Sequence, residues 1–224
     1  FKKMGGKMPM WIMELLDGKK TSLEIQNELS EKVKSLVVKG INPPHLAAVL
    51  VGDDGPSRTY VNAKVKACER IGFKSTLHHL SSDTSEIELL KVIKKLNEDD
   101  SVDGFIVQLP LPNHIDDHKI TLAISPKKDV DGFHPENVGK MALGLPTFLP
   151  ATPNGIMELL KRYEIPTDGK NTVVIGRSSI VGTPMSILMS RKSNPGNSTV
   201  TLAHSRTKNL EQICRQADIL IVAI

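Results

Sequence analysis

Two hydrophobic periods alternate along this chain. Stretches in which apolar residues recur every three or four positions, as on one helix face, are followed by short, continuously apolar runs typical of buried strands. The first helical stretch, residues 23–38, has one apolar stripe made of Ile25, Leu29, Val33 and Leu36. Strands are predicted at residues 46–51, 73–80, 102–109, 172–175, 198–203 and 217–224. This alternation predicts an α/β fold with mostly parallel strands.

Capping residues mark where several helices begin and end. A helix that begins near Ser57 is stopped by Gly72, and Ser85-Glu86-Ile87-Glu88 has the form of a capping box that opens the next helix. Thr152 and Pro153 are residue types preferred at an N-cap and at the first helical position. We expect the helix that starts there to bridge two domains.

Residues 110–150 divide the chain into two parts. They contain six prolines and three glycines, so they are predicted to be loop-rich. We place the boundary at their end, with one domain at residues 12–150 and a second at residues 151–224. The apolar strand predicted at residues 217–224 would need helices over both faces, so we expect the second domain to lack a C-terminal part.

A polar residue ends the third predicted strand. Gln108 closes an apolar run, and Pro110 and Pro112 prevent the strand from continuing. Its amide is therefore expected at the carboxyl edge of a parallel sheet, where ligands collect in open α/β folds.

Tyr60 and Lys64 are four residues apart on the helix after the first strand, so they share a face that can look into the same crevice. An amine that exchanges protons near neutral pH needs partial desolvation, and a tyrosine supplies an apolar wall and a hydroxyl. The alternative is an exposed pair with no function.

Two carboxylates flank a valine in the run Asp129-Val130-Asp131-Gly132. A carboxylate can accept two parallel hydrogen bonds from the edge of a pterin or a guanine. The other possibilities are a metal site and a capped turn, and the residues by themselves favour the turn.

The run from Gly176 to Gly182 lies between a predicted strand and a helix that starts near Pro184, which is the context of a phosphate-binding loop. It departs from the G-x-G-x-x-G fingerprint, because Ser178 replaces the second glycine and the last glycine comes one position late. The following strand ends in hydroxyls and a cation, where an NAD site would have a carboxylate. Such groups favour the 2′-phosphate of NADP; the alternative is that Arg206 caps a surface turn. The candidate cofactor contacts are Gly176, Arg177, Ser178, Val181, Gly182, His204, Ser205 and Arg206.

Composition narrows the class of partner. The 224 residues carry a net charge of +4, and only 4% are aromatic. The lysines are spread along helix faces without stacking aromatics, which favours an anionic small molecule over a nucleic acid. No apolar run is long enough for a membrane helix. Cys68 and Cys214 indicate a reducing compartment and neither a disulfide framework nor a zinc site.

The expected location is cytoplasmic. The first ten residues, Phe1–Met10, carry three lysines and no acid. A mitochondrial location is the alternative if they are the remnant of a transit peptide.

Together these motifs resemble the bifunctional methylenetetrahydrofolate dehydrogenase/methenyltetrahydrofolate cyclohydrolase family, from about Leu15 to the end of the chain. The residues that carry the resemblance are Tyr60-Val61-Asn62-Ala63-Lys64, the pattern from Glu86 to Leu111, Lys127-Lys128-Asp129-Val130-Asp131-Gly132 and the run from Val174 to Gly182. A further family signature, Pro-Gly-Gly-Val-Gly-Pro, is not reached before the sequence ends.

The resemblance implies an N-terminal three-layer α/β folate domain and a C-terminal Rossmann-like NAD(P)-binding domain, with a cleft between them. It implies NADP as the cofactor, tetrahydrofolates as substrates, a homodimer and no metal. Lys64 would be the acid/base residue of the cyclohydrolase step, and Gln108 would orient and tune it. Tyr60 would pack on the folate and Asp131 would hold the pterin edge.

The implied reactions are the NADP-dependent oxidation of 5,10-methylenetetrahydrofolate to 5,10-methenyltetrahydrofolate and its hydrolysis to 10-formyltetrahydrofolate. Two competing hypotheses are another NADP-dependent dehydrogenase, acting on an amino or hydroxy acid, and a basic nucleic-acid-binding module. The dispersed charge and scarce aromatics argue against the latter.

Overall fold

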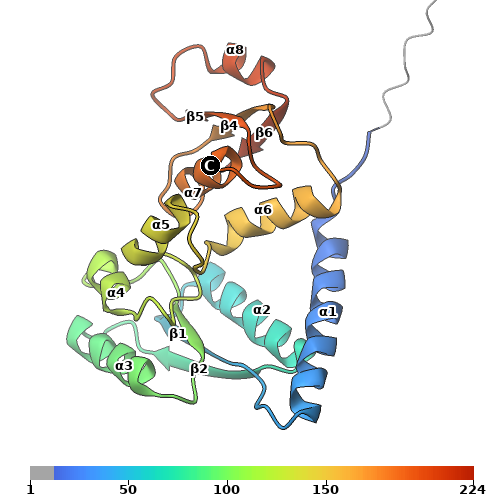
Figure 1. Ribbon diagram of the computed structural model, residues 1–224. Helices are drawn as coiled ribbons and strands as arrows, with labels where there is room; N and C mark the ends of the chain where they lie inside the picture. The colour runs from blue at the N-terminus through green and yellow to red at the C-terminus, as the bar shows by residue number, and fades with distance from the viewer. Residues whose placement is uncertain (1–12) are drawn as a thin grey trace, which may run out of the picture.

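The computed structural model describes residues 13–224, which form two parallel three-stranded sheets with helices packed against them (Figure 1). The strands are β1 (His45–Val51), β2 (Lys74–Leu80), β3 (Gly104–Val107), β4 (Asn171–Ile175), β5 (Thr199–Ala203) and β6 (Ile219–Val222). The helices are α1 (Gly18–Val38), α2 (Gly55–Ile71), α3 (Glu86–Glu98), α4 (Asp117–Ala123), α5 (Pro135–Ala142), α6 (Ala151–Arg162), α7 (Gly182–Ser190) and α8 (Leu210–Arg215). The strand orders are β2-β1-β3 and β5-β4-β6, and every pair is parallel, as predicted.

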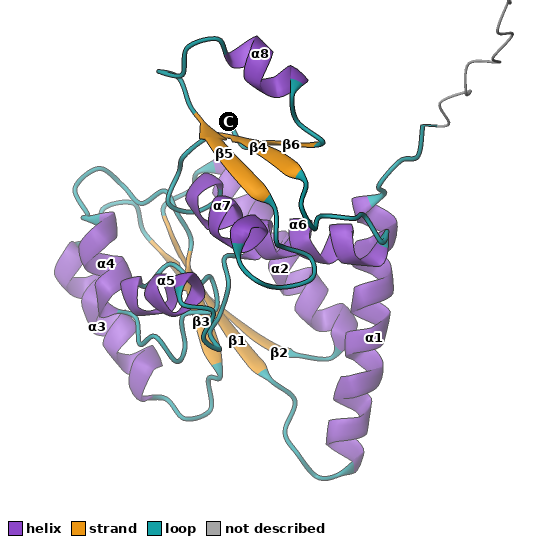
Figure 2. Ribbon diagram, turned by 45° about the horizontal axis from the view of Figure 1, so that its top comes forward, coloured by secondary structure: helices purple, strands orange, loops and turns teal. Residues whose placement is uncertain are grey.

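The N-terminal sheet is the middle of three layers. Figure 2 shows α3 and α4 on one side of this sheet and α2 on the other. Side chains alternate along the central strand β1, so that Ala47 and Val49 pack with α3 and α4, whereas Ala48 and Leu50 pack with α2. All four residues are almost fully buried. A strand that is covered on both faces reads as a continuous apolar run, which is why β1 was recognisable in the sequence.

The C-terminal sheet supports the second apolar core. Met185, Leu188 and Met189 of α7 are buried there, together with Val174 of β4 and Met141 of α5. Helix α6 packs against α7 and contacts α1, and it runs between the two sheets (Figure 1). It therefore bridges the two halves, as predicted.

The apolar strand predicted at residues 217–224 is present as β6, and the structure shows which of its faces is covered. Strand β6 forms, but it pairs only with β4 and lies at the edge of the sheet. Ile221 points into the second core, whereas Leu220 and Val222 are 48% and 56% exposed. Alternate residues of a strand point to opposite faces, so only one face of β6 is covered here.

The predicted helix ends are confirmed at two places and wrong at a third. Ser85 and Glu88 form the capping box of α3, and Gly72 ends α2 in the left-handed conformation, with φ of 85°. Thr152 is not an N-cap, because α6 begins at Ala151 and Pro150 precedes it with φ of −52°. The proline ring fixes that angle and leads the chain into the helix, which leaves Thr152 inside the first turn.

Residues 110–150 contain two short helices that the prediction missed. Asp116 caps α4 by accepting a hydrogen bond from the His118 N–H at 2.8 Å, and Pro135 lies in the first turn of α5. Helices of this length span about two turns, so they leave little apolar periodicity in the sequence. Across residues 13–224, no helix combines the length and the apolar character needed to cross a membrane.

Candidate functional site

Helix α2 presents Tyr60 and Lys64 at the carboxyl edge of the N-terminal sheet. The helix begins directly after β1, where the Asp54 carboxylate accepts a hydrogen bond from the Ser57 N–H at 2.9 Å. Val61 is fully buried against the sheet, so the helix is fixed in rotation. Tyr60 is 64% exposed. The functional pair therefore stands on a rigid support while its own side chains remain accessible.

Gln108 follows directly after β3. Its backbone N–H donates to the Val49 oxygen at 2.9 Å, which continues the sheet pairing by one residue. Its side-chain Nε2 donates to the Leu109 oxygen at 2.7 Å. The backbone thus fixes the amide, and the tuning of Lys64 by Gln108 stays a prediction.

Asp131 lies opposite Lys64. The distance from Lys64 Nζ to Asp131 Oδ1 is 3.7 Å, which makes an ion pair without a direct hydrogen bond. The two side chains are 36% and 17% exposed, so the amine is partly desolvated. Burial raises the pKa of Asp131 above its ordinary value, the Lys64 charge opposes that rise, and the Asp129 carboxylate adds to it.

The predicted folate residues and the candidate cofactor loop line the same solvent-open hollow, which has a volume of about 800 Å³. The residues that line it are Tyr60, Lys64, Gln108, Leu109, Asp131, Phe133, Ala151, Thr152, Ile180 and Val181. All four predicted folate residues are present, and Ile180 and Val181 approach from the C-terminal half. Sequence reasoning missed Phe133 and Thr152, although Phe133 stands only two residues after Asp131 and aromatics are scarce in this chain.

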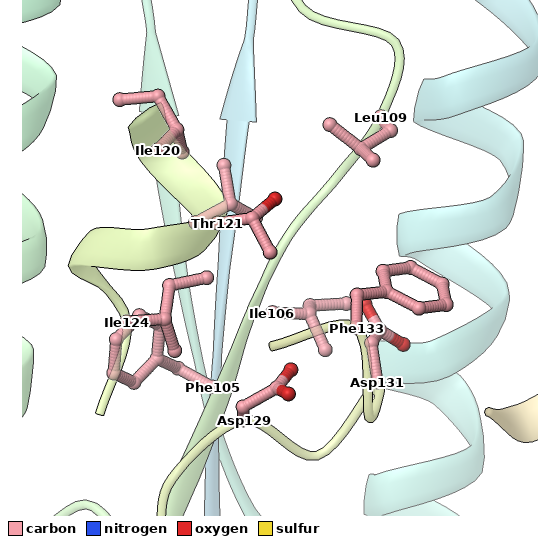
Figure 3. A pocket seen from close by; sticks show the side chains of 10 residues that line it. Phe105, Ile106, Leu109, Ile120, Thr121, Ile124, Asp129, Asp131 and Phe133 are labelled. Atoms are coloured by element: carbon pink, nitrogen blue, oxygen red, sulfur yellow. The ribbon is translucent and has the colours of Figure 1, made fainter. Parts of the chain in front are cut away.

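The two carboxylates of the Asp129–Gly132 run have different roles. Asp129 is only 2% exposed and accepts hydrogen bonds from the backbone N–H groups of Gly132 and His134 and from Asn137 Nδ2. Figure 3 shows Asp129 beneath Ile106, with Asp131 beside Phe133. The turn-capping alternative thus describes Asp129, and Asp131 remains available to a ligand. Within residues 13–224, no three His, Cys, Asp or Glu residues are grouped so as to hold a metal ion.

Close packing at the loop from Gly176 to Gly182 explains its glycines. Gly176 has φ of 115°, and a Cβ there would lie 2.0 Å from the Ala223 oxygen. A Cβ on Gly182 would lie 1.9 Å from the Gly176 oxygen. Ser178 Oγ accepts hydrogen bonds from the N–H groups of Val181 at 3.1 Å and Gly182 at 3.3 Å. The serine that replaces the second glycine thus binds two N–H groups at the start of α7, and the loop joins a strand to a helix, as in a dinucleotide-binding fold.

The strand register brings the remaining cofactor candidates to the same edge. Ile175 pairs with Ala203, so Arg177 and Ser205 each lie two residues beyond the paired strand ends. The residues after β5 form a tight turn, in which the Arg206 N–H donates to His204 Nδ1 at 3.2 Å. Arg177 and Arg206 are exposed and have no ion-pair partner within residues 13–224. Two unpaired cations with no carboxylate in the turn fit a phosphate better than ribose hydroxyls.

Two family models match the chain. The catalytic domain of tetrahydrofolate dehydrogenase/cyclohydrolase matches residues 16–131, and the NAD(P)-binding domain of the same enzymes matches residues 150–224. The bifunctional protein FolD of Flavobacterium johnsoniae is 64% identical over 212 residues, which cover 95% of this chain and 72% of that protein.

Solved structures of the same enzymes have the same fold. The bifunctional FolD of Campylobacter jejuni is 51% identical, with a TM-score of 0.89 over 95% of this chain and 74% of that one. The Trypanosoma brucei methylenetetrahydrofolate dehydrogenase-cyclohydrolase, complexed with NADP and an inhibitor, is 33% identical. Its TM-score is 0.88 over 94% of this chain and 71% of that one.

Proposed function

The chain belongs to the tetrahydrofolate dehydrogenase/cyclohydrolase family, and from this premise we propose that it is a bifunctional, NADP-dependent enzyme of one-carbon metabolism. It oxidises 5,10-methylenetetrahydrofolate to 5,10-methenyltetrahydrofolate and hydrolyses that product to 10-formyltetrahydrofolate. The observation that carries this proposal is the single hollow in which Lys64 and Asp131 meet the loop bearing Ile180 and Val181. One folate molecule can then undergo both steps without leaving the cleft.

The folate side supplies binding and proton transfer. Asp131 accepts hydrogen bonds from the pterin edge, and Tyr60 forms the wall against which the folate packs. In the hydrolysis, water adds to the methenyl carbon and loses both of its protons as the formyl carbonyl forms. The bond from that carbon to one folate nitrogen breaks, one of the two protons goes to this nitrogen, and the other is released to solvent. Lys64 is the group that moves these protons, since its amine lies in the cleft and is partly desolvated. Gln108 positions it from the end of β3.

The cofactor side supplies phosphate binding. NADP, when bound, provides the hydride acceptor for the dehydrogenase step. The glycine-containing loop before α7 would hold its pyrophosphate, and Arg177, Ser205 and Arg206 lie at the strand ends, where such a fold recognises the adenosine ribose. Val181 and His204 complete the proposed contacts. No carboxylate stands in this turn to repel the 2′-phosphate.

Separate assays of the two steps test the proposed function. The purified protein should form methenyltetrahydrofolate from methylenetetrahydrofolate with NADP. Without any cofactor it should hydrolyse methenyltetrahydrofolate faster than buffer alone. A protein that folds but catalyses neither step would contradict the proposal.

We also propose a homodimer and a cytoplasmic location. The dimer rests on the family resemblance alone, and a single monomeric species in sedimentation at micromolar concentration would contradict it. The bacterial relatives and the two free cysteines support the cytoplasm and give a mitochondrial location no support. The Phe1–Met10 segment, on which the mitochondrial alternative depends, lies outside the described residues.

The boundary between residues 150 and 151 likewise remains a proposal. The second family match begins at residue 150, which supports it. Helix α5 precedes this boundary, yet its Met141 packs in the second core. Limited proteolysis tests the boundary. If the protease cuts before α5, and α5 stays with the C-terminal fragment, the domain boundary lies before α5.

A further inference from the structure

A buried polar network holds the loop that carries Asp131, and the functional roles above leave this network unused. The Asp129 carboxylate accepts hydrogen bonds from the Gly132 N–H at 3.1 Å and the His134 N–H at 2.8 Å. These two bonds tie the backbone on the far side of Asp131 back to Asp129. The segment from Asp129 to His134 is therefore a closed loop with Asp131 inside it.

Asn137 of α5 fixes the orientation of the Asp129 carboxylate. Its Nδ2 donates to Asp129 Oδ2 at 2.8 Å and to the Pro126 oxygen at 3.0 Å. Its Oδ1 accepts a hydrogen bond from Thr147 Oγ1 at 2.7 Å. The residue is 2% exposed, and exchanging its oxygen and nitrogen would break the bonds to Asp129 and Pro126, whose oxygens can only accept. Asn137 thus has a single orientation that satisfies its surroundings.

The backbone that follows Thr147 holds the same loop from the other side. Gly132 has φ of 70°, and a Cβ there would lie 2.9 Å from the Phe148 oxygen and from the Pro150 nitrogen. The loop is therefore clamped between the Asp129 carboxylate and residues 148–150. Thr147 joins the two sides, because it bonds to Asn137 and directly precedes the packed backbone.

We propose that Asn137 is a positioning residue for the folate site, which acts through Asp129 to hold the loop that aims Asp131 at Lys64. The inference rests on the proposed function, since the role of Asp131 in folate binding belongs to it. Asn137 does not line the hollow that contains Lys64, so its effect on the folate passes through the loop that carries Asp131 and Phe133. Replacing it removes a donor from a buried carboxylate and frees the loop, while the residues of the cofactor loop keep their contacts.

A double-mutant cycle tests this coupling. Asn137→Ala should raise the KM for methylenetetrahydrofolate about tenfold and change the dissociation constant for NADP by less than twofold. In an Asp131→Ala background, Asn137→Ala should raise the folate KM much less, because the main group that it positions is gone and only Phe133 of this loop still lines the hollow. A purely structural residue would have the same effect in both backgrounds.

Asn97→Ala is the matched control for loss of an amide network. Asn97 Nδ2 donates to the Ala123 oxygen and its Oδ1 accepts from the Ser125 N–H, both at 2.8 Å. It reaches Asp129 only through Ser125, whose oxygen accepts the Asp129 N–H at 3.0 Å, and it makes no bond to the Asp129 carboxylate. It should lower the melting temperature and leave the folate KM within twofold of wild type. If Asn137→Ala does not fold, Thr147→Val removes only the bond to Asn137 Oδ1 and should raise the folate KM about threefold. Its control is Thr167→Val, which loses the bond from the Gly196 N–H in the C-terminal half.

The outcomes separate this inference from the proposed function. A wild-type protein without either activity overturns the proposed function itself. If the wild type is active and a folded Asn137 or Thr147 variant has an unchanged folate KM, only the role of Asn137 is overturned. Equal effects of Asn137→Ala with and without Asp131, or an equal rise in folate KM for Asn97→Ala, also overturn it.

Discussion

The folate side and the cofactor side of the cleft hold their charges in opposite ways. On the folate side, Lys64 faces Asp131 at 3.7 Å, and the loop under Asp131 is tied by the buried Asp129 and Asn137. On the cofactor side, Arg177 and Arg206 extend from turns at the strand ends into solvent. The Lys64–Asp131 pair is thus formed and partly desolvated before any ligand binds, whereas the two arginines are unpaired and exposed to solvent.

The difference follows from what each set has to do. A group that moves protons needs a fixed position and a partly desolvated amine, which only a packed surround can give. A guanidinium that binds a phosphate keeps its charge at any physiological pH, so it can remain solvated and unpaired until the phosphate of the ligand binds. Substitutions on the two sides should therefore change different quantities, namely turnover, folate affinity and the pH dependence of stability on the folate side, and cofactor selectivity on the cofactor side.

The largest expected effect is that of Lys64→Met on the cyclohydrolase. Methionine keeps much of the side-chain volume and cannot transfer a proton, so we expect the hydrolysis rate to fall at least about a hundredfold. The dissociation constant for NADP should stay within twofold. Lys66→Met is the control, since Lys66 is exposed on the same helix and does not line the hollow. A Lys64→Met protein that hydrolyses methenyltetrahydrofolate normally would remove Lys64 from the mechanism.

Asp131→Ala should weaken folate binding without unfolding the protein. Loss of a charged, doubly hydrogen-bonded contact costs about 2 kcal/mol or more, which is roughly thirtyfold in affinity. Titration with a tetrahydrofolate substrate measures this, and the exposed Asp100→Ala is the control. An unfolded variant, or a folded one with unchanged folate affinity, would show that Asp131 only shapes its turn.

The double variant Arg177→Ala, Arg206→Ala tests the cofactor side. We expect wild type to prefer NADP over NAD by about 2 kcal/mol, roughly thirtyfold in kcat/KM. The variant should lose most of this preference by using NADP less well, because NAD offers the two guanidiniums only neutral hydroxyls. Arg215→Ala on α8 removes another exposed arginine of the same half and should leave the ratio unchanged. Equal use of both cofactors by wild type would contradict the assignment.

The sequence was sufficient to place most of the site because a few local rules act together. Helical spacing put Tyr60 and Lys64 on one face, and the prolines after Gln108 ended its strand. Parallel strands then brought those ends to one edge. Each of these rules concerns neighbours in sequence or a property of the whole sheet, so none of them requires knowledge of contacts between distant side chains.

What the sequence could not provide depends on contacts between separate segments. Asp129 and Asp131 are chemically alike and two residues apart, and only the packing of α5 shows which one is buried. Helix α5 was itself missed, so the bonds of Asn137 to Asp129 and Thr147 had no basis for prediction. Ser178 is a departure from the glycine fingerprint, and only the path of the loop shows that its hydroxyl binds the N–H groups of Val181 and Gly182.

The smallest expected effect is on stability, and it concerns Asp131→Asn. Burial raises the pKa of Asp131, so the folded protein binds a proton more tightly there than the unfolded chain does. Stability conferred by that proton is present at low pH and falls as the pH rises from about 4 through the folded-state pKa. An asparagine side chain at this position cannot ionise, so we expect the melting temperature of Asp131→Asn to exceed that of wild type at neutral pH. For a chain of this size each kcal/mol corresponds to roughly 2–4 °C.

Asp54→Asn provides a control of opposite sign on the helix that carries Lys64. Hydrogen bonds from Ser57 lower the pKa of Asp54, so its contribution to stability is present above the unfolded-state pKa and lost as the pH falls through the folded-state value. Asparagine is also a good N-cap, so only the contribution of the charge should disappear. Asp54→Asn should therefore melt below wild type at neutral pH and approach it in acid. Asp131→Asn should melt above wild type at neutral pH and lose that advantage in acid. If Asp131→Asn melts at or below wild type at neutral pH while Asp54→Asn behaves as expected, then burial of the Asp131 charge does not lower the stability of the folded protein.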